Sequence, residues 1–62
     1  MALLVVIDVE KNKMVINTNH IVQVIEDREY IEVTLSNGTD VVLKRTIEEF
    51  LYMVDAVGGG AQ

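Results

Sequence analysis

An alternating apolar segment followed by Asn37-Gly38 is the feature that most restricts how this chain folds. Residues 30–35 alternate between apolar and mostly polar side chains, which predicts a strand with one buried face. Asn-Gly between two apolar runs predicts a tight type I′ hairpin turn, because that turn needs positive φ at both central residues. Residues 40–44 are therefore expected to form the next strand, antiparallel to 30–35.

Three further strands are expected before this hairpin. Eleven Val and six Ile among 62 residues favour extended structure, because β-branched side chains pack well on pleated surfaces. The expected strands are residues 2–9, 14–16 and 21–25, separated by polar turns. The apolar side chains of the first and third do not alternate, which is typical of strands that are covered on both faces.

The period of the apolar residues changes after the last strand. Thr46 and Glu49 have the spacing of a capping box, which predicts that a helix begins there. The face expected to turn inward carries residues at helical spacing, with Met53 beside it and Val57 extending it: Ile47, Phe50, Leu51 and Val54. Gly58 is a typical residue to follow the end of a helix.

These segments predict one small domain of the mainly β (α+β) class. We expect an antiparallel meander of about five strands, a small barrel-like sheet, with one C-terminal helix packed across it. Residues 1–57 form the domain, and residues 58–62 are expected to be a flexible, Gly-rich tail. A chain of 62 residues has no room for a second domain. Its core is too small to enclose a deep pocket.

Composition argues against several chemistries. The chain has no cysteine, which excludes disulfides, thiolate nucleophiles and the usual structural zinc sites. No basic stretch precedes an apolar run, and the longest apolar run, 2–7, is too short for a membrane helix. The acidic turn at 26–29 lacks the ligand spacing of a calcium loop, and no phosphate-binding glycine pattern occurs. We predict a cytoplasmic protein with no cofactor, no metal and no membrane insertion.

One combination of residues could form a hydrolytic site. If each turn reverses the chain, His20, Ser36 and Asp40 lie at the same end of the sheet. A histidine base beside a serine nucleophile is a known catalytic arrangement. However, the sequence has no nucleophile elbow and no evident oxyanion site. We therefore predict that the protein is not an enzyme.

The same path places every basic residue at the opposite end of the sheet. These residues are the candidate contacts for nucleic acid: Lys11, Lys13, Arg28, Lys44 and Arg45. Acidic residues share the same turns, and the whole chain carries a formal charge of −5. Both facts weaken attraction to phosphate. Binding to nucleic acid is thus the alternative hypothesis, and not the first.

Self-association is the function that the apolar pattern favours. A single helix covers only part of one face of the sheet, so a second copy is expected to cover apolar side chains that remain. The expected interface consists of Leu4, Val6, Val22 and Val24, or of the alternating residues beside them, with Tyr52 on the outer side of the helix. The sequence therefore predicts a non-catalytic, homo-oligomeric interaction module, with a further protein partner that it does not identify.

Residues 16–21, 33–38, 41–44 and 46–49 together resemble the FlbD family of small flagellar-operon proteins. The matching segments read INTNHI, VTLSNG, VVLK and TIEE, and the similarity spans about two thirds of the chain. The resemblance implies two hairpins followed by a helix, and an accessory role associated with flagella. A phage or mobile-element accessory protein would show the same pattern.

A second resemblance concerns the start of the helix. Residues 44–49, KRTIEE, are similar to the helix start of LytTR DNA-binding domains, which also follows a hairpin. This resemblance implies a small transcriptional regulator whose basic residues contact DNA.

Overall fold

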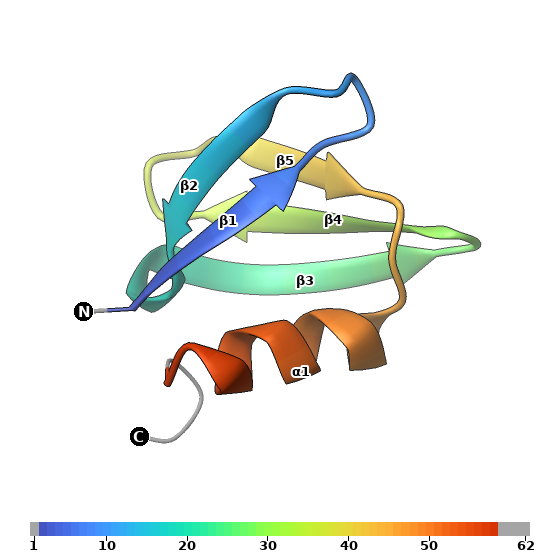
Figure 1. Ribbon diagram of the computed structural model, residues 1–62. Coiled ribbons are helices and arrows are strands. Elements are labelled where there is room, and N and C mark those ends of the chain that lie inside the picture. The colour runs from blue at the N-terminus through green and yellow to red at the C-terminus, as the bar shows by residue number, and fades with distance from the viewer. Residues whose placement is uncertain (1, 59–62) are drawn as a thin grey trace.

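The computed structural model describes residues 2–58, which form five strands, one short 3₁₀ helix and one α-helix (Figure 1). In chain order these are β1 (Leu3–Ile7), β2 (Lys13–Asn17), η1 (Thr18–His20), β3 (Ile21–Asp27), β4 (Tyr30–Leu35), β5 (Asp40–Leu43) and α1 (Ile47–Ala56). The predicted mainly β, α+β class with one C-terminal helix is confirmed. The predicted tail falls outside the described residues except for Gly58.

The prediction of one five-stranded meander is wrong, because the strands form two separate antiparallel sheets. β1 and β2 make a two-stranded ribbon, and β3, β4 and β5 make a three-stranded sheet in that order. Figure 1 shows the ribbon crossing one face of the three-stranded sheet, with α1 alongside β3. The crossing lets the ribbon cover apolar side chains that a single helix would leave exposed in a flat sheet.

The 3₁₀ helix η1 separates the two sheets. The Asn17 side chain accepts a hydrogen bond from the Asn19 N–H at 3.0 Å and so caps the turn. The buried Thr18 donates its backbone N–H to the Ala2 carbonyl at 2.9 Å, which fixes the start of β1. The chain therefore changes direction after β2, and β3 pairs with β4 instead of with β2.

The core lies between the ribbon, the three-stranded sheet and the helix. Both sheets and α1 contribute buried apolar side chains: Leu4, Val6, Ile16, Ile31, Val33, Val41, Leu43 and Phe50. Apolar side chains at the margin, including Met14, Ile21, Val24 and Met53, pack against this cluster. The core thus joins residues that are far apart in the sequence, and each element buries only one face.

The structure explains why apolar and polar residues do not alternate in the sequences of β1 and β3. In β1 the burial alternates strictly, with Leu4 and Val6 inward and the apolar residues between them outward. In β3 a bulge lies between Ile21 and Gln23. The extra residue shifts the phase of the strand, so Ile21 and Val24 both pack on the core while Val22 points outward.

The β4–β5 hairpin forms where the sequence predicts it, but the turn type differs. Gly38 has φ of +88°, whereas Asn37 is not among the described residues with positive φ. The Gly38 N–H bonds the Leu35 carbonyl at 2.9 Å, and the Leu35 N–H bonds the Thr39 carbonyl at 2.9 Å. This is a type I turn followed by a glycine bulge, and not type I′. The Asn37 side chain accepts from the Thr39 N–H at 3.0 Å, which stabilises this loop.

The capping box of α1 is confirmed. The Thr46 hydroxyl accepts from the Glu49 N–H at 3.1 Å, and the Glu49 carboxylate accepts from the Thr46 N–H at 3.0 Å. Gly58 follows the C-cap with φ of +84°, as expected for a residue at that position. The predicted inner face is wrong at Leu51, which is 58% exposed. α1 is rotated so that Met53, and not Leu51, packs beside Phe50 on the core.

Candidate functional site

The outer surface of the ribbon carries four apolar side chains. Leu3, Val5 and Ile7 project from β1 and are 51%, 51% and 59% exposed. Val15 of β2 lies directly opposite Val5 in the register and is 58% exposed. The Cβ atoms of cross-strand neighbours such as these two valines lie about 5 Å apart. We call these four residues the ribbon face.

The predicted interface residues fall into two groups. Leu4 and Val6 lie in the core of the protein's own fold, so they are not on the surface that a partner meets. Val24 is partly buried against the same core. Val22 and Tyr52 are 64% and 77% exposed. On β1 the surface is therefore provided by the alternating residues beside the buried pair.

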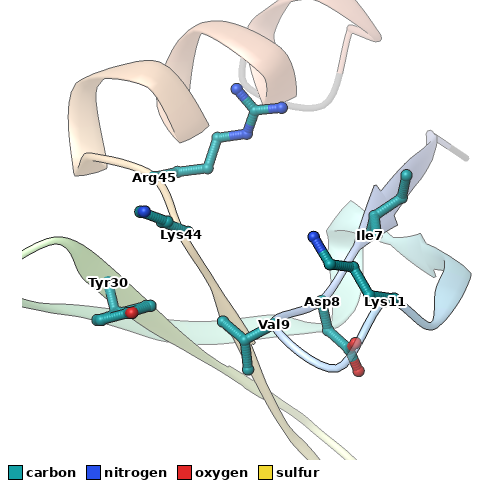
Figure 2. Close-up of a pocket in the computed structure, with 7 residues that line it drawn as sticks. All are labelled: Ile7, Asp8, Val9, Lys11, Tyr30, Lys44 and Arg45. Atoms are coloured by element: carbon teal, nitrogen blue, oxygen red, sulfur yellow. The ribbon is translucent and has the colours of Figure 1, made fainter.

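Three of the five basic residues line one surface cavity of about 230 Å³ (Figure 2). Lys11 comes from the β1–β2 turn, and Lys44 and Arg45 come from the link between β5 and α1. Tyr30, at the start of β4, lines the same cavity. The fold thus brings together cations that lie more than thirty positions apart in the sequence. We call this cavity the basic pocket.

Carboxylates offset part of this positive charge. Asp8 is itself a lining residue of the basic pocket. The Lys44 ammonium lies 4.0 Å from the Glu29 carboxylate, and both side chains are largely exposed. An exposed pair at this distance contributes little to stability. Its main effect is to lower the attraction of the pocket for an anion.

The other two basic residues that were predicted to contact nucleic acid do not line the basic pocket. Lys13 lies on β2 opposite Ile7, beside the ribbon face. Arg28 occupies the β3–β4 turn with φ of +61°, in the left-handed region. The basic residues are therefore not one continuous patch that could follow a nucleic-acid backbone.

Asp8 organises the turn that carries Lys11. Its carboxylate accepts backbone N–H bonds from Asn12 at 2.8 Å and Glu10 at 2.9 Å, and a bond from the Asn12 side-chain amide at 3.2 Å. The bond from the Asn12 backbone is the largest cause that holds the pKa of Asp8 below its ordinary value of 3.8. The carboxylate is thus charged at neutral pH. The backbone carbonyl of Asp8 accepts a hydrogen bond from the Lys11 N–H at 3.0 Å, and Lys11 has φ of +70°.

The lowered pKa of Asp8 predicts a contribution to stability that depends on pH. A carboxyl whose pKa is lower in the folded than in the unfolded chain stabilises the fold above its unfolded pKa. That contribution is lost as the pH falls below about 4 and through the folded pKa. We expect Asp8→Asn to reduce the stability difference between pH 7 and pH 3, measured by urea unfolding. Glu10→Gln, beside it in the turn, is the control; an equal reduction in that variant would contradict the assignment.

The structure brings His20 near Ser36, but only through the backbone. The Ser36 N–H donates to the His20 carbonyl at 2.7 Å. The Asp40 carboxylate accepts from the Thr34 hydroxyl at 3.0 Å instead of from the histidine. In residues 2–58 the His20, Ser36 and Asp40 side chains share no hydrogen bond with one another. Within the same range, no three His, Cys, Asp or Glu side chains form a cluster that could hold a metal ion.

Sequence reasoning left open which side of β1 faces outward, because it named either Leu4 and Val6 or the alternating residues beside them. The run from Leu3 to Ile7 contains apolar residues on both sides of the strand. A register that differs by one residue would exchange the buried and exposed sets. The one available signal is that the run is apolar on both faces, which indicates an apolar surface without showing which residues form it.

No helix within residues 2–58 is long and apolar enough to cross a membrane. Scans against protein-family models, curated proteins and solved structures find no match to this chain. The FlbD-like and LytTR-like resemblances therefore remain predictions from the sequence.

Proposed function

We propose that this protein is a non-catalytic interaction module that forms a homo-oligomer through the β1–β2 ribbon, which carries the ribbon face. The observation that carries the proposal is the gathering of Leu3, Val5, Ile7 and Val15 on one surface, each more than half exposed. No charged side chain lies among the four, and Lys13 and Asn17 border them on β2. An exposed apolar cluster with a polar border is typical of a protein interface.

The energetic reason is the unfavourable hydration of these side chains. Burying an aliphatic side chain completely contributes about 1.5–3 kcal/mol. Each of the four is already about half buried, so covering it completely contributes roughly 1 kcal/mol. Covering the ribbon faces of two copies completely therefore contributes at most about 8 kcal/mol, against an association cost of about 4–15 kcal/mol. We therefore expect reversible association and not a permanent complex.

The proposal is tested by native mass from light scattering across a dilution series. We expect the wild-type protein to dissociate on dilution from a multiple of 6.9 kDa. Val5→Asp places a charge on the ribbon face, at the centre of β1, and is expected to shift the mass to the monomer. Val22→Asp is the matched control, since this valine is also more than half exposed but lies on β3. A monomeric wild type would refute the proposal, and dissociation by Val22→Asp alone would move the interface to β3.

The cellular role is proposed from the sequence resemblance. The FlbD-like segments support an accessory role in a flagellar assembly, and the same pattern supports a phage or mobile-element accessory protein. Neither role needs a catalytic site. In both, a self-associating module would present its remaining surface to a further protein partner.

Binding to DNA is the second candidate function. The observation in its favour is that Lys11, Lys44 and Arg45 line one pocket. Against it stand the carboxylates of Asp8 and Glu29 and the formal charge of −5. Contacts to phosphate weaken steeply as salt concentration rises. The salt dependence of any binding to a DNA duplex therefore separates this candidate from the first.

A further inference from the structure

The hydrogen-bond pattern of the ribbon shows which backbone groups of β1 face away from β2. The Thr18 N–H bonds the Ala2 carbonyl at 2.9 Å, and the Asp8 N–H bonds the Asn12 carbonyl at 3.0 Å. Hydrogen-bonded pairs alternate along an antiparallel ladder. The even-numbered residues of β1 therefore bond to β2, and the N–H and C=O groups of Leu3, Val5 and Ile7 point to the opposite edge.

This opposite edge of β1 is unpaired from Leu3 to Ile7. β1 pairs with β2 alone, and Figure 1 shows β2 on only one side of it. The same alternation continues at Val9, whose N–H bonds the Val42 carbonyl of β5 at 3.1 Å. Over residues 3–7, β1 is not paired with β5. A cavity of about 150 Å³ lies between this edge of β1 and the side chains of Arg45 and Met53. The backbone groups of three consecutive odd-numbered residues thus lack a strand partner.

The edge of β1 also lacks the features that normally prevent strands from pairing. Proteins protect edge strands with charges, prolines or bulges. β3, one of the two edge strands of the other sheet, has a bulge after Ile21 and ends in Glu26 and Asp27. β1 has none of these, because its sequence is Leu-Leu-Val-Val-Ile and its burial alternates without interruption. The two edges differ in a way that favours pairing at β1.

We propose that two copies of this chain pair antiparallel along β1, edge to edge, around a two-fold axis at Val5. Val5 lies at the centre of the strand, so Leu3 of one copy lies opposite Ile7 of the other. Each of the three opposed pairs exchanges two backbone hydrogen bonds, about six in all. The result is a continuous four-stranded sheet, in which the two ribbon faces form one apolar surface. This inference rests on the proposed homo-oligomer and places its contact at the edge of β1, which covers the ribbon faces only along their shared border.

The absence of charge on β1 favours contact between copies at this strand, and a two-fold axis makes the pairing antiparallel. Each copy carries a formal charge of −5, so contact is favoured at a strand that has no charged side chain. β1 is uncharged, and the charged residues of its hairpin lie in the turn at 8–13. Antiparallel pairing places the two turns at opposite ends of the shared sheet.

Single-cysteine variants test this geometry directly, because the chain has no cysteine of its own. In the paired sheet the two copies of residue 5 face each other with Cα atoms about 5.5 Å apart, within disulfide range. The two copies of residue 15 are separated by three strand spacings, about 14 Å, which is out of range. Val5 and Val15 are similarly exposed and adjacent on one face, so they are a matched pair.

Under mild oxidation we expect Val5→Cys to form disulfide-linked dimers at least about tenfold faster than Val15→Cys. Equal rates, or a faster Val15→Cys, in a protein that still has a dimeric mass would show that the copies meet face to face. That result would overturn edge pairing while leaving the proposed oligomer intact. A wild-type protein that is monomeric at every concentration would overturn both.

Amide hydrogen exchange on the wild-type protein gives a second test that needs no variant. In the monomer the Val5 N–H has no partner, so it exchanges rapidly, whereas the Leu4 N–H is held by β2. Raising the protein concentration is expected to slow exchange at Leu3, Val5 and Ile7 by at least about tenfold and to leave Leu4 unchanged. Concentration-independent exchange at Val5 in a protein shown to be dimeric would contradict strand pairing.

Discussion

Phe50→Ala is expected to remove a large part of the stability of the fold. Phe50 is the largest fully buried side chain of the described residues and is 1% exposed. Truncating a buried phenylalanine costs about 3–5 kcal/mol, through lost burial and the cavity left behind. A protein of this length has a total stability of roughly 3–9 kcal/mol. The loss therefore removes between about a third and all of the free energy of unfolding.

The reason for this sensitivity is that a single buried residue anchors α1 to the core. Phe50 is the only buried residue of the helix, while its neighbours on the inner face are partly exposed. A ten-residue helix is not stable alone in water, so loss of this anchor is expected to release α1 from β3. Circular dichroism during thermal unfolding measures the effect. Tyr52→Ala is the control on the same helix, because Tyr52 is 77% exposed and its truncation is expected to change stability by less than about 0.5 kcal/mol. A Phe50→Ala protein with wild-type unfolding would refute the assigned core.

Val6→Asp is expected to unfold the protein, and Val22→Asp is expected to leave it folded. Val6 is 4% exposed and lies in the core between the ribbon and the three-stranded sheet. A carboxylate placed there has no cationic partner in the core cluster, and burying an unpaired charge costs several kcal/mol. Val22→Asp introduces the same charge at a position that is 64% exposed, where water solvates it.

The two variants separate a structural from an interfacial role for the apolar strands. Far-ultraviolet circular dichroism and urea titration measure folding, and light scattering on the same samples measures mass. We expect Val6→Asp to lose its folded signal at every concentration. Val22→Asp should unfold within about 0.5 kcal/mol of the wild type. A folded Val6→Asp protein would mean that β1 presents its even-numbered residues to solvent, which would reverse the assignment of the ribbon face.

Short-range rules account for the elements that the sequence predicts well. The capping box of Thr46 and Glu49, the glycine after α1 and the hairpin at Asn37-Gly38 each depend on residues within a few positions of one another. The type of the hairpin turn was predicted incorrectly. Asn37 bonds the Thr39 N–H in a conformation that needs positive φ only at Gly38. The dipeptide is compatible with both turns, and side-chain hydrogen bonding selects one.

The candidate surfaces were only partly predictable. The turn pattern predicted that the basic residues would gather at one end, and three of them line the basic pocket. The ribbon face was not predictable as a set of residues, because Leu3–Ile7 is apolar throughout. Leu51 was placed inward because its helical spacing fits, whereas packing against β3 rotates the helix toward Met53. These decisions need the position of one element relative to another.

The sequence by itself determined the five strands, their antiparallel hairpins and the boundaries of the α-helix, because hydrophobic period, caps and turn residues act over a few positions. Only the tertiary structure decided that the strands divide into two sheets, that Leu4 and Val6 face the core, and that Val5 is exposed at a free edge. The physical reason is that a strand with apolar residues on both sides can bury either side. The choice is made by the surface against which it packs, and here that surface is formed by residues 31–43 and Phe50.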